Sequence, residues 1–422
     1  MNCIDKIHSL DKFGSRPGLD RIKRFLDILG NPQDRLRFVH VAGTNGKGSV
    51  CALISSTLTA AGYKTGLFIS PYITDFCERI QVNGRMIPVE VLENAVERTF
   101  PIIEQLREDD CIITEFEYVM ALEFLIHSEA KCDIVVLETG LGGLLDCTNV
   151  IKPPLCSVIT RIGLDHTAVL GDTIEEITIQ KCGIIKPSSV AVTSAQDEEV
   201  MRIIVDDCRA KGVSLVKSGG ISIKILEETI DGTKFEYNNS VITLPLIGSH
   251  QIENAKTALS ALESIKADFP VSPDEIKIGF KNAVNPARFE VLSKNPLVIL
   301  DGAHNPNGVC ALKNALEKYV NKKPKLLVIG MLADKDSRSS LSILSGKFRK
   351  VYTVPVNNPR TLSSDELARE CKSYFDNVES FASVFEAIDS ALVSAKQTDC
   401  ALVIAGSLYL AGEARSYIFD KL

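Results

Sequence analysis

A glycine-rich segment near the N-terminus constrains the fold more than any other stretch of the chain. Residues 41–49 read Val-Ala-Gly-Thr-Asn-Gly-Lys-Gly-Ser, between an apolar run at 36–41 and a helical pattern that opens at Val50. A strand, a glycine turn and a helix in this order form an anion site, because backbone N–H groups converge on phosphate oxygens there. The segment therefore predicts a bound nucleoside triphosphate whose outer phosphates Lys47 reaches; the alternative is a glycine turn that carries a solvated lysine.

Two positions depart from the usual phosphate-binding loop. Val41 stands where glycine is usual, and Gly48 follows Lys47 where a serine or threonine hydroxyl usually binds Mg²⁺. Either Ser49 supplies that hydroxyl, or the metal ion draws its oxygen ligands from elsewhere in the chain.

Length and charge exclude several classes of protein. The 422 residues suffice for two or three domains, and a net charge of −7 argues against a nucleic-acid scaffold. The N-terminus has no signal-peptide pattern, and no apolar run approaches the ~18 residues that span a bilayer. We expect a cytoplasmic protein with small-molecule substrates and neither nucleic-acid nor membrane partners. Its 12 cysteines, none in a C-x-x-C pair, predict buried thiols rather than a zinc site.

Apolar strands alternate with helical patterns over the first two thirds of the chain. Helices are expected at 89–106 and 115–127, and strands at 65–71, 133–138, 156–160 and 190–193. Such strands joined by helices predict a parallel sheet covered on both faces. Residues 213–247 differ, because Asp231-Gly232 and Asn238-Asn239 are hairpin signals that predict a small antiparallel insertion.

A second α/β unit is expected beyond Ser293-Lys294-Asn295-Pro296, with strands at 297–301, 325–330, 351–354 and 401–405. The predicted fold is therefore α/β. A P-loop-type, mainly parallel sheet domain with a small antiparallel β insertion covers residues 1–293, and a second Rossmann-like α/β domain covers residues 297–422.

Polar residues stand where the predicted strands end, which is where ligands gather in open α/β sheets. Glu138 suits Mg²⁺ or a water molecule, although an ordinary strand-end glutamate is the alternative. His166 is an unusual ligand for Mg²⁺, so the residues alone favour a hydrogen-bonding role in its loop. Lys181, on the following helix, is a further candidate residue, although an ordinary surface lysine is the alternative. In the second unit, 301–306 is another polar loop at a strand's carboxyl end, and the backbone N–H groups at the helix start by Ser407 could receive a carboxylate.

The chain also carries a series of short motifs in a fixed order. They are Arg-Pro-Gly-Leu-Asp-Arg at 16–21, the glycine-rich loop, Leu-Phe-Ile-Ser-Pro at 67–71, Glu-Arg-Ile at 78–80, residues 138–149, Gly-Leu-Asp-His-Thr at 163–167, Lys-Cys-Gly-Ile-Ile-Lys-Pro at 181–187, His-Gln-Ile-Glu-Asn-Ala at 250–255, Pro-Ala-Arg-Phe-Glu at 286–290, Asp-Gly-Ala-His-Asn-Pro at 301–306 and Gly-Ser-Leu-Tyr at 406–409. With them the chain resembles the folylpolyglutamate synthase family, including its bifunctional dihydrofolate synthases, within the Mur ligase superfamily. The resemblance covers nearly the whole length.

The resemblance implies an ADP-forming ligase that adds L-glutamate to the carboxylate of a folate or of dihydropteroate through an acyl phosphate. ATP would be a co-substrate that acts with two Mg²⁺ ions, and a monovalent cation could bind as well. The protein would be a monomer. Catalytic roles would fall to Lys47, Lys181 and His304.

The resemblance also implies binding residues, position by position. ATP would be contacted by Asn45, Gly46, Lys47, Gly48, Ser49, Asn254, Arg288 and Asp301. The Mg²⁺ ligands would be Ser70, Glu138 and His166, against the interpretation of His166 from the residues alone, together with Lys181 as a carbamate. Glutamate would contact His304 and Ser407. The folate or pterin pocket would include Ser15, Arg16, Phe116, Glu117, Leu145, Asp146 and Cys147.

Two departures from the family pattern concern the acceptor pocket. Leu144 stands where family members commonly carry arginine, and Cys77 stands where many carry asparagine. Three alternative functions stay open: a Mur ligase with a UDP-muramyl acceptor, a kinase with a hydroxyl acceptor, and a nucleotide sensor without turnover.

Overall fold

The computed structural model describes residues 2–10 and 18–421, and the chain forms two compact units. The first runs up to Lys224 and also includes Glu236–Ile242 and Ile252–Ala283. The second comprises Ile225–Phe235, Thr243–Gln251 and the chain from Val284 onward. Both are built on a sheet with helices, as predicted.

An eight-stranded sheet organises the first unit, in the order β4-β3-β2-β5-β1-β6-β7-β8. All pairs from β2 to β8 are parallel, and β3 and β4 add an antiparallel edge. The strands are β1 (Phe38–Ala42), β2 (Thr65–Phe68), β3 (Ile80–Val82), β4 (Arg85–Met86), β5 (Ile134–Glu138), β6 (Cys156–Ile159), β7 (Val190–Thr193) and β8 (Ser214–Lys217).

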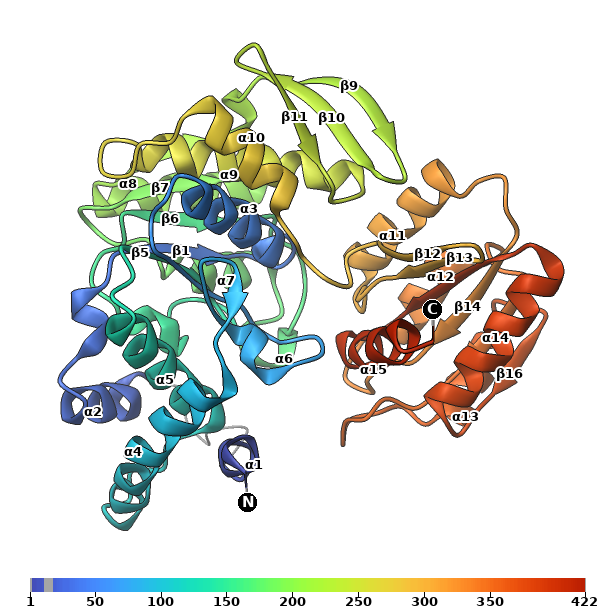
Figure 1. The fold of residues 1–422 in the computed structure, drawn as a ribbon, viewed down its shortest axis with the longest axis horizontal. Helices are drawn as coiled ribbons and strands as arrows, with labels where there is room; N and C mark the ends of the chain where they lie inside the picture. The colour runs from blue at the N-terminus through green and yellow to red at the C-terminus, as the bar shows by residue number, and fades with distance from the viewer. Residues whose placement is uncertain (1, 11–17, 422) are drawn as a thin grey trace. The chain divides into compact units, whose positions relative to one another are not determined.

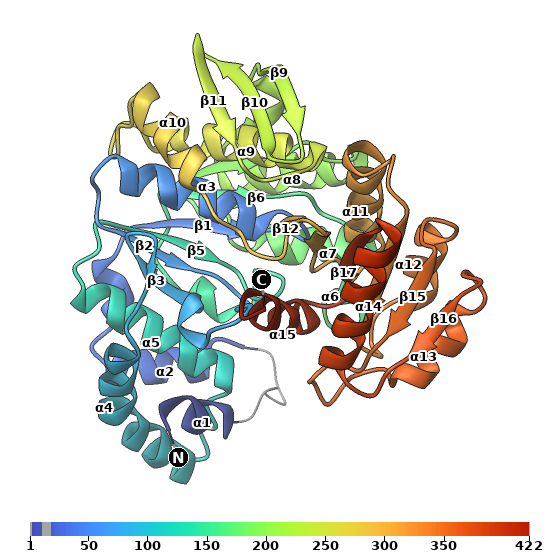
Figure 2. The same cartoon turned by 45° about the vertical axis from the view of Figure 1, so that its right-hand side comes forward.

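Helices cover both faces of this sheet, which is why its central strands are buried along their whole length. Figures 1 and 2 show α3 and α10 on one face and α2, α4 and α5 on the other. All five residues of β1 and of β5 are buried. The helices of this unit are α1 (Cys3–His8), α2 (Asp20–Ile28), α3 (Lys47–Ala60), α4 (Val89–Glu108), α5 (Glu115–Glu129), α6 (Thr167–Leu170), α7 (Ile174–Cys182), α8 (Glu198–Lys211), α9 (Ser249–Ile265, from its fourth residue) and α10 (Pro273–Asn282).

The predicted antiparallel insertion is shorter than residues 213–247. β8 pairs parallel with β7 and ends the main sheet, because the chain returns to the sheet through α8 and such a crossover leaves neighbouring strands parallel. A separate three-stranded sheet holds β9 (Lys224–Thr229), β10 (Gly232–Tyr237) and β11 (Ser240–Leu244). Its two-residue loops make it antiparallel, and Asn238 and Asn239, with φ of 47° and 60°, match the twisted hairpin turn that the sequence predicted.

The second unit contains a six-stranded sheet in the order β12-β13-β17-β14-β15-β16. Only β12 runs antiparallel. The strands are β12 (Glu290–Lys294), β13 (Leu297–Leu300), β14 (Lys325–Ile329), β15 (Lys350–Thr353), β16 (Val378–Ser380) and β17 (Ala401–Ala405). The helices are α11 (Pro306–Tyr319), α12 (Ser337–Leu344), α13 (Ser364–Cys371), α14 (Val384–Thr398) and α15 (Leu408–Phe419).

The structure moves the predicted boundary at 293–297. β12 pairs with β13, so Asn295-Pro296 is the turn of a hairpin within the second sheet and not a linker. The compact second unit takes up the chain already at Val284. The short edge strand β16 was not expected, because three residues with polar Glu379 and Ser380 carry no strand pattern.

The helices of the second unit divide between two faces. Residues of α11, α12 and α13 share one hydrophobic core with the sheet, whereas α14 packs against α15. The helices that follow the neighbouring strands β13 and β17 therefore leave the sheet on opposite sides. In doubly wound folds this arrangement opens a crevice at the carboxyl ends of the two strands.

The cysteine side chains follow the expectation from the sequence. All 12 cysteines are free, and each is buried except Cys310. Within residues 2–10 and 18–421, no helix combines the length and the apolar character that crossing a membrane requires.

Candidate functional site

The glycine-rich segment forms the predicted strand, turn and helix. β1 ends at Ala42, and α3 begins at Lys47, directly after Gly46 with φ of 92°. The first hydrogen bond of the helix runs from Val50 N to Gly46 O, and the leading N–H groups of a helix have no acceptor within it. The turn therefore offers the positive end of α3 to an anion.

Two glycines of this turn leave no room for a side chain. A Cβ atom at Gly43 would lie 1.9 Å from Thr160 Oγ1, and one at Gly46 would lie 2.4 Å from Asn254 Oδ1. Asn254 is buried on α9 and thus lies against the turn, as expected for a residue that contacts ATP. Thr44 N and Asn45 N donate to Arg161 O, at 3.0 and 3.1 Å, which ties the turn to the chain beyond β6.

Replacing Gly46 by alanine should raise the KM for ATP at least about tenfold, because the new methyl group collides with Asn254 beside the bound phosphates. Gly62→Ala is the matched control: Gly62 has a similar φ of 86°, but a Cβ atom added there would meet nothing within 4 Å. Both variants pay about 1–2 kcal/mol for a left-handed backbone. Thermal melting and ATP KM measured together separate the two effects, and equal ATP KM values in the two variants would contradict the steric argument.

Two lysine side chains meet at the carbonyl oxygen of Gly43. Lys47 Nζ donates to it at 3.2 Å and lies 3.9 Å from Glu138 Oε1. Lys181 Nζ donates to the same oxygen at 2.9 Å, and this lysine is 4% exposed, so the surface alternative is wrong. Burial, followed by repulsion from Lys47, lowers the pKa of Lys181 to about 7.

Parallel register brings Ser70 and Glu138 to the same edge of the sheet. Val41 of β1 is paired with Glu138 of β5, and Phe68 of β2 with Leu137. Ser70 N accordingly lies 3.4 Å from Glu138 Oε2. The two predicted metal ligands therefore lie beside each other and beside Lys47.

This donor set suits a magnesium–nucleotide complex. Mg²⁺ takes oxygen ligands and usually keeps water and phosphate oxygens besides one or two carboxylates. Glu138 supplies a buried carboxylate and Ser70 a hydroxyl. Across residues 2–10 and 18–421, no group of three or more His, Cys, Asp and Glu side chains could hold a metal ion. The residues thus fit an ion that shares its ligands with a nucleotide, rather than an all-protein cage.

His166 lies in the loop that follows β6, at the N-terminus of the short helix α6. Its side chain is 43% exposed, and its Nε2 atom lies 3.9 Å from Asp165 Oδ1. The residue has φ of 51°, an uncommon conformation outside glycine that often marks functional loops. Its assignment as a metal ligand stays a prediction.

Arg79 is a residue of this site to which the sequence assigned no role. Its Nη1 atom donates to Ser70 Oγ at 3.0 Å, while the rings of Tyr72 and Phe76 lie 5.1 and 5.5 Å from its guanidinium carbon. The Glu-Arg-Ile motif at 78–80 was the available signal. Only the folded hairpin shows that the arginine reaches back to the strand end.

Two of the predicted acceptor residues lie beside Gly140, and a third lies next to one of these two. A Cβ atom at Gly140 would lie 2.4 Å from the Phe116 ring and 3.2 Å from Asp146 Oδ2. Cys147 Sγ lies 3.9 Å from Phe116 O. The loop after β5 therefore brings these side chains together.

The remaining predicted acceptor residues are placed differently. The Glu117 carboxylate pairs with Arg21 at 3.0 Å and accepts hydrogen bonds from Thr114, so it caps α5 in this structure. Leu145 is exposed, as is its neighbour Leu144. Ser15 and Arg16 lie outside the described residues.

In the second unit, the loops that carry His304 and Ser407 lie side by side. β13 and β17 are parallel neighbours, and Gly406 N donates to Ala303 O at 3.0 Å. Ser407 is 2% exposed and caps α15, since its Oγ atom accepts from Tyr409 N at 3.1 Å. His304 Nδ1 lies 2.9 Å from Gly302 O, which assigns a proton to Nδ1, so that Nε2 is an acceptor when the ring is neutral.

Arg288 and Asp301 meet at the start of the same unit. Asp301 is half-buried, and its two carboxylate oxygens accept from Phe289 N at 2.7 Å and Ala303 N at 2.8 Å. Arg288 stands between Ala287 and Phe289, whose φ values are 56° and 48°. Two left-handed residues on either side of one arginine hold its side chain in a strained loop.

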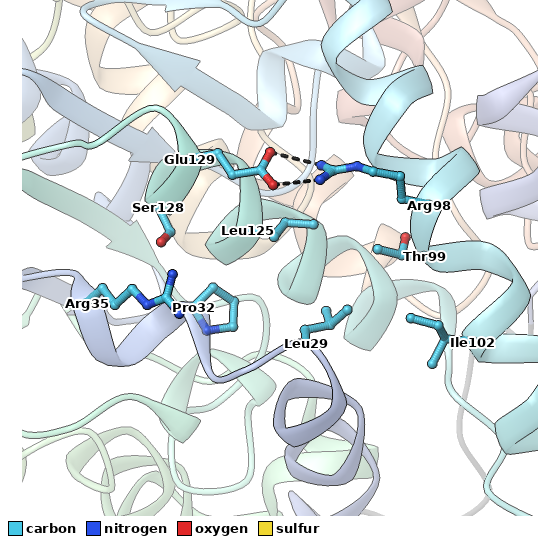
Figure 3. A pocket seen from close by; sticks show the side chains of 9 residues that line it. All are labelled: Leu29, Pro32, Arg35, Arg98, Thr99, Ile102, Leu125, Ser128 and Glu129. Carbon is cyan, nitrogen blue, oxygen red and sulfur yellow. Dashed lines mark hydrogen bonds and ion pairs between the residues drawn. The ribbon is translucent and has the colours of Figure 1, made fainter.

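A cavity lies elsewhere in the first unit. It measures about 370 Å³ and is lined by nine residues of α4, α5 and the segment 29–35, with the Arg98–Glu129 ion pair at its edge (Figure 3). None of the nine residues belongs to the predicted site.

Comparisons with known proteins match both parts of the chain. The Mur ligase middle domain matches residues 41–262, and the Mur ligase glutamate ligase domain matches residues 287–408. A Bacillus subtilis dihydrofolate synthase/folylpolyglutamate synthase is 35% identical, with 97% of this chain and 96% of the relative covered.

This chain belongs to the Mur ligase family.

Within the Mur ligase family, solved structures agree along the whole chain. A Thermotoga maritima folylpolyglutamate synthase is 37% identical, with a TM-score of 0.86 and coverage of 99% of this chain and 96% of that one. E. coli FolC, in complex with DHPP and ADP, is 31% identical with a TM-score of 0.87, covering 100% and 98%. The Mur ligase middle-domain match begins at Val41, the first residue of the glycine-rich segment, and the glutamate ligase match includes Arg288, Asp301, His304 and Ser407.

Proposed function

We propose that this chain is an ATP-dependent ligase that joins L-glutamate to the carboxylate of a folate-type acceptor and releases ADP and phosphate. The observation that carries the proposal is the cluster at the glycine-rich turn, where Lys47 and Lys181 share the Gly43 carbonyl beside Glu138. A cation cluster at a helix N-terminus suits a triphosphate, and the family supplies the reaction class.

The reaction begins with activation of the acceptor. Its carboxylate oxygen attacks the γ-phosphorus of ATP, the bond to the β–γ bridging oxygen breaks, and ADP leaves with the electron pair. The resulting acyl phosphate has a good leaving group, which a free carboxylate lacks. The neutral amine of glutamate then adds to the acyl carbon, and the tetrahedral intermediate collapses to the amide and phosphate.

The protein assists mainly by positioning and by offsetting charge. Lys47 and the N-terminus of α3 face the phosphates, where negative charge spreads in the transition state. Ser70 and Glu138 would hold Mg²⁺, which neutralises phosphate charge when bound, and we assign His166 to the same ion. A second Mg²⁺ would need a further carboxylate, which Lys181 would provide as a carbamate.

The second unit supplies the residues proposed for glutamate. His304 keeps Nε2 as an acceptor because Nδ1–H is directed at Gly302 O. This nitrogen can therefore accept a hydrogen bond from the glutamate amine and orient its lone pair. The N-terminus of α15, capped by Ser407, suits the glutamate carboxylate.

Replacing Ser407 by alanine should raise the KM for glutamate about tenfold while the KM for ATP changes less than about twofold. The matched control is Ser383→Ala. Ser383 lies just after the edge strand β16 and also caps a helix, α14, because its side chain accepts a hydrogen bond from Glu386 N. Both variants lose about 1 kcal/mol of stability as cap removals. Parallel rises of the two KM values in Ser407→Ala would argue against a glutamate site.

The acceptor is tested by incorporation of radiolabelled glutamate. Dihydropteroate, tetrahydrofolate monoglutamate and a UDP-muramyl acceptor are compared, with ADP measured in parallel. We expect both dihydropteroate and the reduced folate to be extended, since a relative with both activities in its name covers the same length. Equal amounts of ADP and conjugate support the ligase; turnover with the UDP-muramyl acceptor alone, or phosphate transfer without glutamate, contradicts the folate assignment.

A further inference from the structure

A buried chain of hydrogen bonds links the strand of the glycine-rich turn to the loop after β5. His40, in the middle of β1, lies with Nε2 2.9 Å from Thr148 Oγ1, and Thr148 Oγ1 lies 2.5 Å from Asp146 Oδ1. His40 and Thr148 are fully buried, and Asp146 is 6% exposed. Neither His40 nor Thr148 has a role in the reaction described above.

The direction of each bond follows from the carboxylate at one end. An ionised Asp146 can only accept, so the Thr148 hydroxyl must donate to it. That hydroxyl then accepts from His40, whose proton must sit on Nε2. The other nitrogen, Nδ1, is buried and has no hydrogen-bond partner in the described part of the chain. Burial lowers the pKa of His40 to about 3, which keeps the ring neutral and this tautomer in place.

The same carboxylate shapes the acceptor loop. Asp146 Oδ1 also accepts from Thr148 N at 3.0 Å, and Oδ2 accepts from Leu141 N at 2.7 Å, which closes the loop 141–146 on itself. Burial raises the pKa of Asp146, and the bond from Thr148 is the first of several effects that oppose it. With two donors on Oδ1 and one on Oδ2, a single acceptor position remains, on the Oδ2 atom that lies near the Phe116 ring at Gly140.

We propose that His40 and Thr148 are positioning residues that orient the Asp146 carboxylate, so that its Oδ2 atom accepts a hydrogen bond from an N–H donor of the acceptor substrate. The inference rests on the proposed function, because it assigns Asp146 to the acceptor pocket. It also gives a physical reason for the histidine inside an otherwise apolar strand. His40 lies on β1, the strand that leads into the glycine-rich turn, and from there it helps to orient the loop that follows β5.

The test compares Thr148→Val with Thr148→Ser in the complete enzyme. Thr148→Val removes the hydroxyl at nearly constant volume and should raise the acceptor KM about tenfold, with the ATP KM changed less than about twofold. Thr148→Ser retains the hydroxyl and should stay within about threefold of wild type. The control is Thr99→Val, which removes a buried hydroxyl that bonds Ala95 O on α4 and the Tyr118 hydroxyl on α5, and should leave both KM values unchanged.

An acceptor KM for Thr148→Val equal to that of wild type, or acceptor and ATP KM values that rise together, would overturn the proposal. If Thr148→Val does not fold, His40→Gln decides instead, with an expected rise of about threefold in acceptor KM alone. An inactive wild-type enzyme would count against the proposed function and not against this hydrogen-bond chain.

Nitrogen NMR of histidine-labelled protein tests the chain without turnover. The His40 ring should show a proton on Nε2 from about pH 5 to pH 8, and that proton should exchange faster with water in Thr148→Val than in wild type. A proton on Nδ1, or exchange that is the same in the two proteins, contradicts the assignment of donors and acceptors.

Discussion

Lys47→Ala should lower kcat/KM for ADP formation at least about a thousandfold, the largest effect expected for any single substitution in this chain. The lysine follows the turn directly, donates to Gly43 O and lies 3.9 Å from Glu138. Without Lys47, the negative charge of the phosphates faces the negative Glu138 carboxylate, and the N-terminus of α3 is left to offset it. The loss should appear with every acceptor, because phosphoryl transfer precedes amide formation.

The control for Lys47→Ala is Lys64→Ala. Lys64 is exposed and follows the far end of α3, at the start of β2, so it belongs to the same strand–helix–strand unit. Its removal should leave ADP formation near wild type. Coupled-assay rates for ADP, together with melting curves for both variants, separate a catalytic loss from a folding defect. Substantial ADP formation by a folded Lys47→Ala variant would refute the phosphate role.

Lys181→Ala should lower kcat about a hundredfold or more, and short carboxylic acids should restore part of the activity. A buried ammonium without a carboxylate partner is costly, and the low pKa of about 7 makes the neutral amine available at physiological pH. The neutral amine attacks carbon dioxide, forms a carbamate and releases a proton. Carbamylation should therefore increase as the pH rises through about 7.

Carbon NMR with labelled bicarbonate measures the carbamate directly. One carbamate resonance should appear in wild type and disappear in Lys181→Ala. Lys186→Met provides the matched control: Lys186 is also a lysine whose pKa burial lowers, to about 8, but its Nζ atom donates to Asn149 O and Ile151 O. That variant should keep the resonance. Fully active enzyme without a carbamate resonance would exclude the modification.

Much of the fold follows from local patterns. The helices predicted at 89–106 and 115–127 became α4 and α5, and the strand at 190–193 became β7 with the same bounds. Each is either a long run with helical periodicity or a fully apolar run, and such a run can bury its apolar side chains in only one type of secondary structure. The misjudged elements, β8, β12 and β16, are short strands at or near sheet edges, and their pairing depends on which strand they reach in space.

The candidate site divides in the same way. Glycine at 43 and 46 and lysine at 47 are properties of one turn, so the sequence alone determined a phosphate-binding loop at the end of an apolar strand. Parallel register then decided that Ser70 lies beside Glu138, and the packing of the loop after β5 against β1 decided that Asp146 meets His40 through Thr148. Local sequence dictates backbone conformation within a few residues, whereas neighbours that lie far apart in the sequence are chosen by how strands and helices share a buried core.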